Sequence, residues 1–164
     1  MCITRILRLL PPERAHRLTL WGLKNGLGPK QIPAQTTITL FGKSLPSFVG
    51  LSGGADKNAE ALAGWKRLGF GFVEAGTVTL EPRAGNAGTR IWRQHDGASL
   101  VNWMGLPNLG LEPFAANLAD FQARSCFGVW IGRRKSLSDR MLRRNAGLIE
   151  MSSPRTETHS PEAL

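Results

Sequence analysis

The chain has 164 residues, of which 41% are hydrophobic and 20% are charged, a composition that excludes a wholly disordered protein and fits one globular domain. Its net charge of +9 predicts an anionic partner. The two cysteines exclude a disulfide framework, and no apolar run reaches the roughly 18 residues that a membrane-spanning helix needs.

The first 35 residues predict a small helical segment. Apolar side chains recur on one face of residues 3–10, and Pro11-Pro12 ends that run. A second helix is predicted to begin at Pro12 and to close at Gly26. Both helices have basic flanks, so two interpretations stay open. They pack on the rest of the domain, or they lie in a membrane interface.

From residue 36 the hydrophobic period changes to that of strands. Residues 36–51 predict a hairpin that leads into a buried strand, residues 58–68 a helix, and residues 70–79 a second buried strand. This order is a βαβ unit, which indicates an α/β fold with a parallel sheet. Further along, residues 81–93 predict a loop with a short strand, residues 113–124 a helix, and residues 127–131 and 147–151 two more strands.

The turn between the first buried strand and its helix is rich in small residues. Gly53-Gly54-Ala55 precedes Asp56 and Lys57, so bare backbone amides and one ammonium group fall at the carboxyl end of a strand. Parallel α/β folds bind anionic cofactors at that place. The alternative is a tight turn in which Asp56 or Asn58 caps the helix and Lys57 is solvated.

Several motifs in this order resemble one family. They are residues 12–16 (Pro-Glu-Arg-Ala-His), the run 69–79, Arg90-Ile-Trp-Arg93, the stretch 102–105 (Asn-Trp-Met-Gly) and Ser152-Ser153-Pro154. The chain is similar to the class 2, quinone-dependent dihydroorotate dehydrogenases, collinearly up to about residue 110. The resemblance implies a partial TIM (β/α)8 barrel of about four parallel strands. Residues 1–35 would form a membrane- and quinone-associated segment, residues 36–151 a partial FMN-binding barrel, and residues 152–164 a polar, disordered tail.

The resemblance also implies roles for single residues. FMN, dihydroorotate or orotate, and a quinone are the expected ligands, and no role needs a metal ion. The catalytic base would be Ser153, and the quinone entrance would be lined by His16 and Arg93. The substrate would contact Lys57 and the stretch Asn102, Trp103, Met104, Gly105 and Leu106. The residues implied to hold FMN are Gly53, Gly54, Ala55, Asp56, Lys57 and Thr77.

The later part of the chain departs from the family pattern. Trp130, Glu150 and Arg155 stand where the family has asparagines, and Trp103 replaces an arginine. With only about four strands, the sheet would keep open edges that an oligomer could cover. We therefore expect impaired or absent activity in the isolated chain. The alternative is a non-catalytic remnant or paralogue that binds an anionic partner through its basic face.

The expected location follows from the family. The resemblance implies peripheral association with the cytoplasmic face of the inner (plasma) membrane, and the N-terminus has no signal peptide pattern. Nucleic acid is not predicted as a partner, because no aromatic stacking platform or reading helix accompanies the arginines of residues 124–144.

Overall fold

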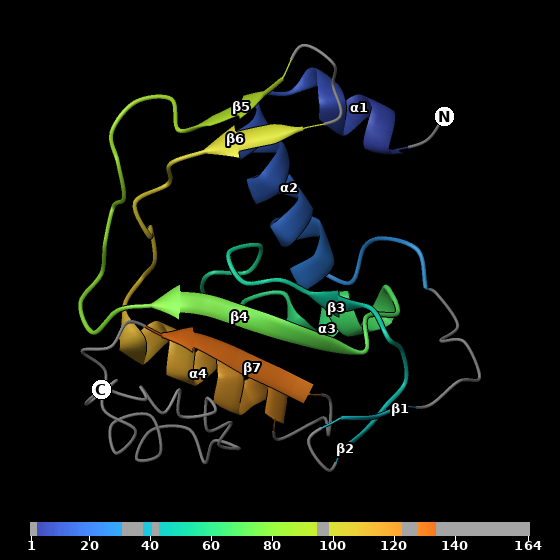
Figure 1. Cartoon of the computed structure of the whole chain (residues 1–164). Coiled ribbons are helices and arrows are strands. Elements are labelled where there is room, and N and C mark those ends of the chain that lie inside the picture. Colours follow the sequence, from blue (N-terminus) through green and yellow to red (C-terminus); the bar gives the residue numbers. More distant parts are fainter. Residues whose placement is uncertain (1–2, 31–37, 41–42, 95–98, 123–127, 134–164) are drawn as a thin grey trace, which may run out of the picture.

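A three-stranded parallel sheet forms the centre of the fold (Figure 1). The computed structural model describes residues 3–30, 38–40, 43–94, 99–122 and 128–133. Strands β3 (Gly50–Leu51), β4 (Phe72–Val78) and β7 (Gly128–Arg133) pair in that order, with Gly50 opposite Phe72 and Phe72 opposite Gly128. The parallel sheet predicted from the βαβ pattern is therefore confirmed.

Two antiparallel hairpins accompany the sheet. Strands β1 (Ile38–Leu40) and β2 (Lys43–Leu45) form the hairpin that residues 36–51 predict. Strands β5 (Ile91–Arg93) and β6 (Leu100–Asn102) form a second hairpin beside the N-terminal helices (Figure 1). Strand β5 lies within the short strand predicted near the end of residues 81–93, whereas β6 was not predicted, because all three of its residues are exposed and no buried face gives them an alternating pattern.

The N-terminal helices are α1 (Ile3–Leu9) and α2 (Pro12–Lys24), as predicted. Pro12 occupies the first turn of α2, where its missing N–H costs nothing, and Gly26 with φ of 80° lies just beyond the end. Ala15, Leu20 and Leu23 are buried, so α2 packs on the domain. Among the described residues, no helix combines the length and the apolarity needed to cross a bilayer.

Helix α3 (Leu62–Arg67) is shorter than the predicted helix over residues 58–68. The Asp56 carboxylate accepts hydrogen bonds from the backbone N–H groups of Glu60 and Ala61, both at 2.9 Å, and Ala59 has a φ of 55°. These bonds hold residues 57–60 as a turn, so the helix starts one turn later than its hydrophobic pattern suggests.

The core lies between the sheet and helices α2, α3 and α4 (Leu111–Gln122). Val73 and Ala75 of β4 are completely buried, as alternate residues of a strand should be when one face packs on helices. The rings of Trp65 and Phe70 meet edge to face at 5.9 Å between centroids. Helix α4 presents its apolar residues three and four positions apart, at Leu111, Phe114, Leu118 and Phe121.

Gly64 allows α2 and α3 to approach closely. A Cβ atom there would lie 2.6 Å from Leu23 Cβ and 2.7 Å from the Leu23 carbonyl oxygen. We expect Gly64→Ala to lower the free energy of unfolding by about 1–3 kcal/mol, because the helices must move apart. Urea denaturation measures this loss. Ala63→Ser, at an exposed position of the same helix, should change stability by less than about 0.5 kcal/mol, and equal effects would contradict the expectation.

Candidate functional site

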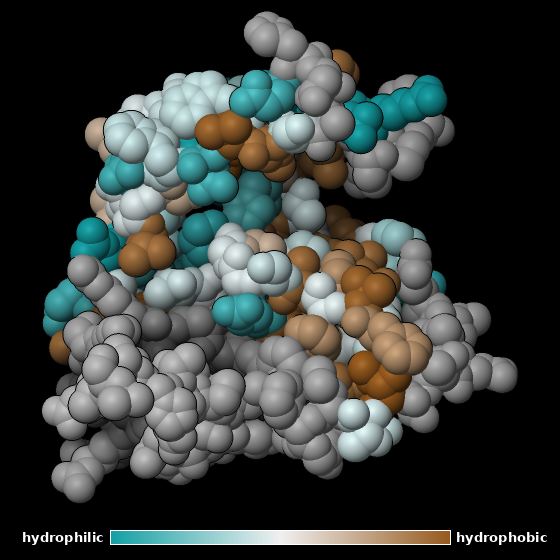
Figure 2. Space-filling model, viewed as in Figure 1, coloured by the Kyte–Doolittle hydropathy of each residue, from teal (hydrophilic) through white to brown (hydrophobic). Residues whose placement is uncertain are grey.

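A cavity of about 730 Å³ lies between the carboxyl ends of β3 and β4 and a wall made by α2 and the β5–β6 hairpin. Figure 2 shows the molecule hollowed between the sheet and the layer that contains α1, β5 and β6. The volume is in the range of small-molecule and cofactor sites. The cavity lining comprises Pro12, Ala15, His16, Thr19, Gly53, Gly54, Ala55, Lys57, Thr77, Asn86, Ile91, Arg93, Leu100, Asn102, Trp103, Met104, Gly105 and Leu106.

The loop after β3 is bonded to the end of β4. Gly54 N–H donates to the Gly76 carbonyl at 2.8 Å, and Gly76 N–H donates to the Asp56 carbonyl at 3.0 Å. A Cβ atom on Gly54 would meet nothing within 4 Å, so this residue faces open space with a φ of 94°. The two loops therefore form one surface with backbone and small side chains at the cavity.

Asp56 does not line the cavity. Its side chain is completely buried, and one carboxylate oxygen accepts from Ala61 N–H at 2.9 Å and from Trp65 Nε1–H at 3.2 Å. The other oxygen accepts from Glu60 N–H. The sequence left open that Asp56 caps the helix, but Ala61 occupies the N-cap of α3 without a side-chain cap bond, and Asp56 instead holds the turn that precedes the helix.

Lys57 lies in the cavity wall beside the glycine loop. Its Nζ donates to the Gly54 carbonyl at 2.5 Å, and the side chain is partly buried. Burial lowers the pKa of Lys57 below its usual value, and the positive charge of Arg90 acts in the same direction, while the charges of Glu13 and Asp56 oppose it. The ammonium group is thus held close to the cavity and partly stripped of water.

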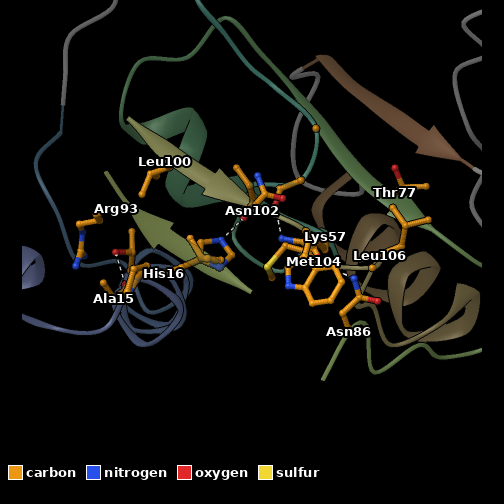
Figure 3. Close-up of a pocket in the computed structure, with 18 residues that line it drawn as sticks. Ala15, His16, Lys57, Thr77, Asn86, Arg93, Leu100, Asn102, Met104 and Leu106 are labelled. Carbon is orange, nitrogen blue, oxygen red and sulfur yellow. Dashed lines mark hydrogen bonds between the residues drawn. The ribbon is translucent and has the colours of Figure 1, made fainter. Parts of the chain in front are cut away.

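The predicted substrate stretch borders the cavity from the hairpin side. Asn102 ends β6, and Met104 and Leu106 follow it in the lining (Figure 3). The Trp103 indole N–H donates to the Thr89 carbonyl at 3.3 Å. Figure 3 places Lys57, Asn102 and Met104 together between Thr77 at one end and Arg93 at the other.

The two predicted quinone-site residues also line this cavity. His16 Nε2–H donates to the Ala55 carbonyl at 2.6 Å, which joins α2 to the glycine loop. Arg93 donates from one terminal nitrogen to the Leu10 carbonyl at 2.8 Å and from the other to the Leu7 carbonyl at 3.4 Å, at the end of α1. A guanidinium group suits a helix carboxyl end, where carbonyls lack partners within the helix.

Two sets of contacts that support the site were not predicted from the sequence: the hydrogen bonds of Asn108 and the Glu13–Arg90 ion pair. Asn108 is buried, and its Oδ1 accepts from Thr79 N–H and Gly110 N–H while its Nδ2 donates to the Leu106 carbonyl at 2.8 Å. It joins the end of β4 to the loop before α4. The Glu13–Arg90 ion pair joins α2 to the hairpin. A lone asparagine and a long-range ion pair leave no local pattern that sequence analysis could have found.

Some predicted residues lie outside the described part of the chain. These are Ser153, Glu150 and Arg155, together with the strand predicted at residues 147–151 and the tail predicted at residues 152–164. The backbone of Trp130 lies in β7, opposite Glu74 of β4.

Comparison with known proteins decides the family. The family model described as dihydroorotate dehydrogenase matches residues 35–157. The chain belongs to the dihydroorotate dehydrogenase family. This confirms the resemblance predicted from the motifs. The dihydroorotate dehydrogenase (quinone) of Bartonella tribocorum is 39% identical over 143 residues, which are 85% of this chain and 40% of that protein. The protein of the same name from Rhodopseudomonas palustris (strain HaA2) is 40% identical over 152 residues, 91% of this chain and 42% of that protein.

Solved dihydroorotate dehydrogenase structures share the fold. The enzyme of Eimeria tenella in complex with ferulenol superposes with a TM-score of 0.68 and 30% identity, over 83% of this chain and 41% of the other. Its ligand-free form gives a TM-score of 0.69 and 29% identity, over 82% and 42%. The chain thus has the α/β fold of part of a dihydroorotate dehydrogenase barrel and spans about two fifths of the length of these relatives.

Proposed function

We propose that the cavity is the FMN and substrate site of a quinone-dependent dihydroorotate dehydrogenase, an enzyme of pyrimidine biosynthesis that oxidises dihydroorotate to orotate. The observation that carries this proposal is the convergence of three segments on one cavity: Gly53, Gly54, Ala55 and Lys57 of the glycine loop, Thr77, and residues 102–106. These three segments come from different parts of the chain and were assigned to one ligand site from the family motifs alone.

The lining fits a flavin. A flat ring system needs close approach to backbone, and Gly54, where a side chain would point into open space, provides it. Flavins also present a polar edge, which the Thr77 hydroxyl and the backbone groups of the glycine loop are suited to bind. When bound, FMN supplies the two-electron acceptor of the reaction. Asp56 acts behind this surface by holding the loop, rather than by touching the ligand.

The other lining residues suit an acidic pyrimidine. The Lys57 ammonium group binds the substrate carboxylate, and its partial desolvation strengthens that attraction. The Asn102 amide offers both a donor and an acceptor to the ring. We propose Ser153 as the group that removes the substrate proton; it lies outside the described residues, and a serine in this role requires a dry pocket.

The Arg93 end of the cavity is proposed as the quinone entrance. His16 and Arg93 line that end, beside helices whose exposed surface includes Leu9, Leu18 and Trp21. Apolar side chains with arginines nearby suit the headgroup region of a bilayer, from which a quinone diffuses. We accordingly propose peripheral association with the cytoplasmic face of the inner membrane.

Flavin binding and turnover test this function. The purified 164-residue chain is titrated with FMN and followed by quenching of flavin fluorescence, and then mixed anaerobically with dihydroorotate. We expect saturable FMN binding, followed by bleaching of the flavin absorbance that added quinone reverses; the bleaching should be slow, in keeping with the impaired activity expected of the isolated chain. Orotate in place of dihydroorotate is the control and should cause no bleaching. A chain that neither binds FMN nor bleaches it would contradict the proposal and favour a non-catalytic relative.

A further inference from the structure

Arg90 joins three segments around the cavity without lining it. Its terminal nitrogens donate to a Glu13 carboxylate oxygen at 2.5 Å and to the carbonyls of Ala84 at 2.6 Å and Asn86 at 3.1 Å, and its Nε donates to both Glu13 oxygens at 3.2 Å. The pair is partly buried, with side-chain exposures of 16% for Arg90 and 34% for Glu13. One guanidinium group thus holds helix α2 and the 84–86 turn together.

Hydrogen bonds extend this junction to the substrate stretch. The Arg90 carbonyl accepts from Trp103 N–H at 3.1 Å. Asn86 Nδ2 donates to the Trp103 carbonyl at 2.5 Å, and Asn86 N–H donates to the Met104 carbonyl at 3.0 Å. The positions of Asn86, Trp103 and Met104, all in the lining, therefore depend on where Arg90 lies.

Glu13 makes the corresponding connection from α2, the other element of this wall. Helix α2 contributes Pro12, Ala15, His16 and Thr19 to the lining. His16 lies one turn after Glu13 and bonds to the glycine loop through Ala55. Fixing Glu13 against Arg90 therefore holds α2 and the hairpin together as one wall that faces the glycine loop.

We propose that Glu13 and Arg90 form a positioning pair that holds α2 and the β5–β6 hairpin together as one wall of the cavity. This inference rests on the proposed function for the identity of the ligand, and on the geometry alone for the positioning. Neither residue lines the cavity, so the pair acts through the side chains that it places.

The charges of the pair also act on Lys57. Burial lowers the pKa of Lys57 most, the positive charge of Arg90 lowers it further, and the negative charges of Glu13 and Asp56 raise it. The hydrogen bond from Arg90 lowers the pKa of Glu13. Removing one partner leaves the charge of the other to act on Lys57 alone, which gives the test of the pair a pH-dependent readout.

The test compares Glu13→Gln, Arg90→Gln and the double variant, with FMN as the probe. We expect each single variant to bind FMN about tenfold more weakly at neutral pH, and the double variant to bind no worse than the weaker single, because both lose one shared interaction. The pH at which the Lys57 contribution to binding is lost should fall in Glu13→Gln and rise in Arg90→Gln. Additive losses, or midpoints that do not move in opposite directions, would overturn the proposal.

Two further variants separate geometry from charge. Arg90→Lys keeps the positive charge but loses the planar fork, so its FMN affinity should fall while its pH midpoint stays near that of the parent chain. Arg14→Gln replaces an exposed residue of α2 and should alter neither the FMN affinity nor the pH midpoint. Unchanged FMN affinity in Arg90→Lys would show that Arg90 has no positioning role.

Amide hydrogen exchange keeps this inference separate from the proposed function. If the parent chain binds no FMN, the proposed function fails, but the pair still predicts faster exchange at the Trp103 and Asn86 amides in Glu13→Gln than in Arg14→Gln. Equal exchange at these amides would overturn the pair whether or not flavin binds. Unchanged exchange in β4 shows that the variant is folded.

Discussion

Replacing Asp56 with alanine is expected to lower the free energy of unfolding by about 3 kcal/mol or more. The substitution leaves Glu60 N–H, Ala61 N–H and the Trp65 indole N–H without the acceptor that the completely buried carboxylate supplies. The loop of residues 53–57 loses its anchor at the same time, so flavin binding should weaken as well. Urea denaturation followed by circular dichroism measures the stability.

The control for Asp56→Ala is Glu81→Ala, which removes an exposed carboxylate from a loop. Glu81→Ala should change the free energy of unfolding by no more than about 0.5 kcal/mol. Asp56→Asn should fall between the two, because the amide keeps one acceptor but turns an NH2 group toward donors. A loss under about 1 kcal/mol in Asp56→Ala would show that water or a neighbouring group replaces the carboxylate.

Replacing Lys57 with methionine should weaken binding of FMN or orotate by at least about tenfold, since a charge-assisted bond contributes roughly 1.5–3 kcal/mol. The affinity for the anion should also depend on pH in a way that is specific to Lys57. Because the pKa of Lys57 is lowered from 10.5, its positive charge is lost at a lower pH than that of a solvated lysine. Affinity for the anion should therefore fall as pH rises through the lowered pKa, and the methionine variant should lack this fall.

Stability should change in the opposite direction over the same pH window. Between the lowered pKa and 10.5 the unfolded chain binds more protons at this site than the folded chain, so the free energy of unfolding rises with pH. The methionine variant should lack this contribution. Lys30→Met removes an exposed lysine outside the cavity and serves as the matched control. Identical pH profiles in Lys57→Met and Lys30→Met would contradict both expectations.

The sequence pattern was sufficient to predict those helices and strands that are determined by neighbouring residues in the chain. The proline and glycine that bound α2, the buried strand β4, and the hairpin of β1 and β2 were all predicted from neighbouring residues. The start of α3 was not, because a side-chain hydrogen bond from Asp56 to Glu60 and Ala61 overrides the helical period of that segment. Strand β6 was not predicted, because its three residues are all exposed and show no alternation of buried and exposed positions.

The same distinction between local and long-range causes applies to the residues of the candidate site. Motif order brought Lys57, Thr77, Asn102, His16 and Arg93 into one list, and all five line the cavity. Asp56 was assigned to the cofactor, yet its side chain points into the core, since an isolated acidic residue in a turn does not reveal its direction. Asn108 and the Glu13–Arg90 pair depend on contacts between distant segments, which no local pattern encodes.

The sequence separation between Glu13 and Arg90 determines when the ion pair can form during synthesis on the ribosome. Glu13 and Arg90 are 77 positions apart, so at about 5–20 residues per second the ribosome needs roughly 4–15 seconds to deliver the second after the first. The apolar side of α2 can meet α3 earlier, because Leu23 touches Gly64. The front of the ligand site, however, stays open throughout that interval, and the nascent protein is exposed to chaperones and proteases until the hairpin emerges.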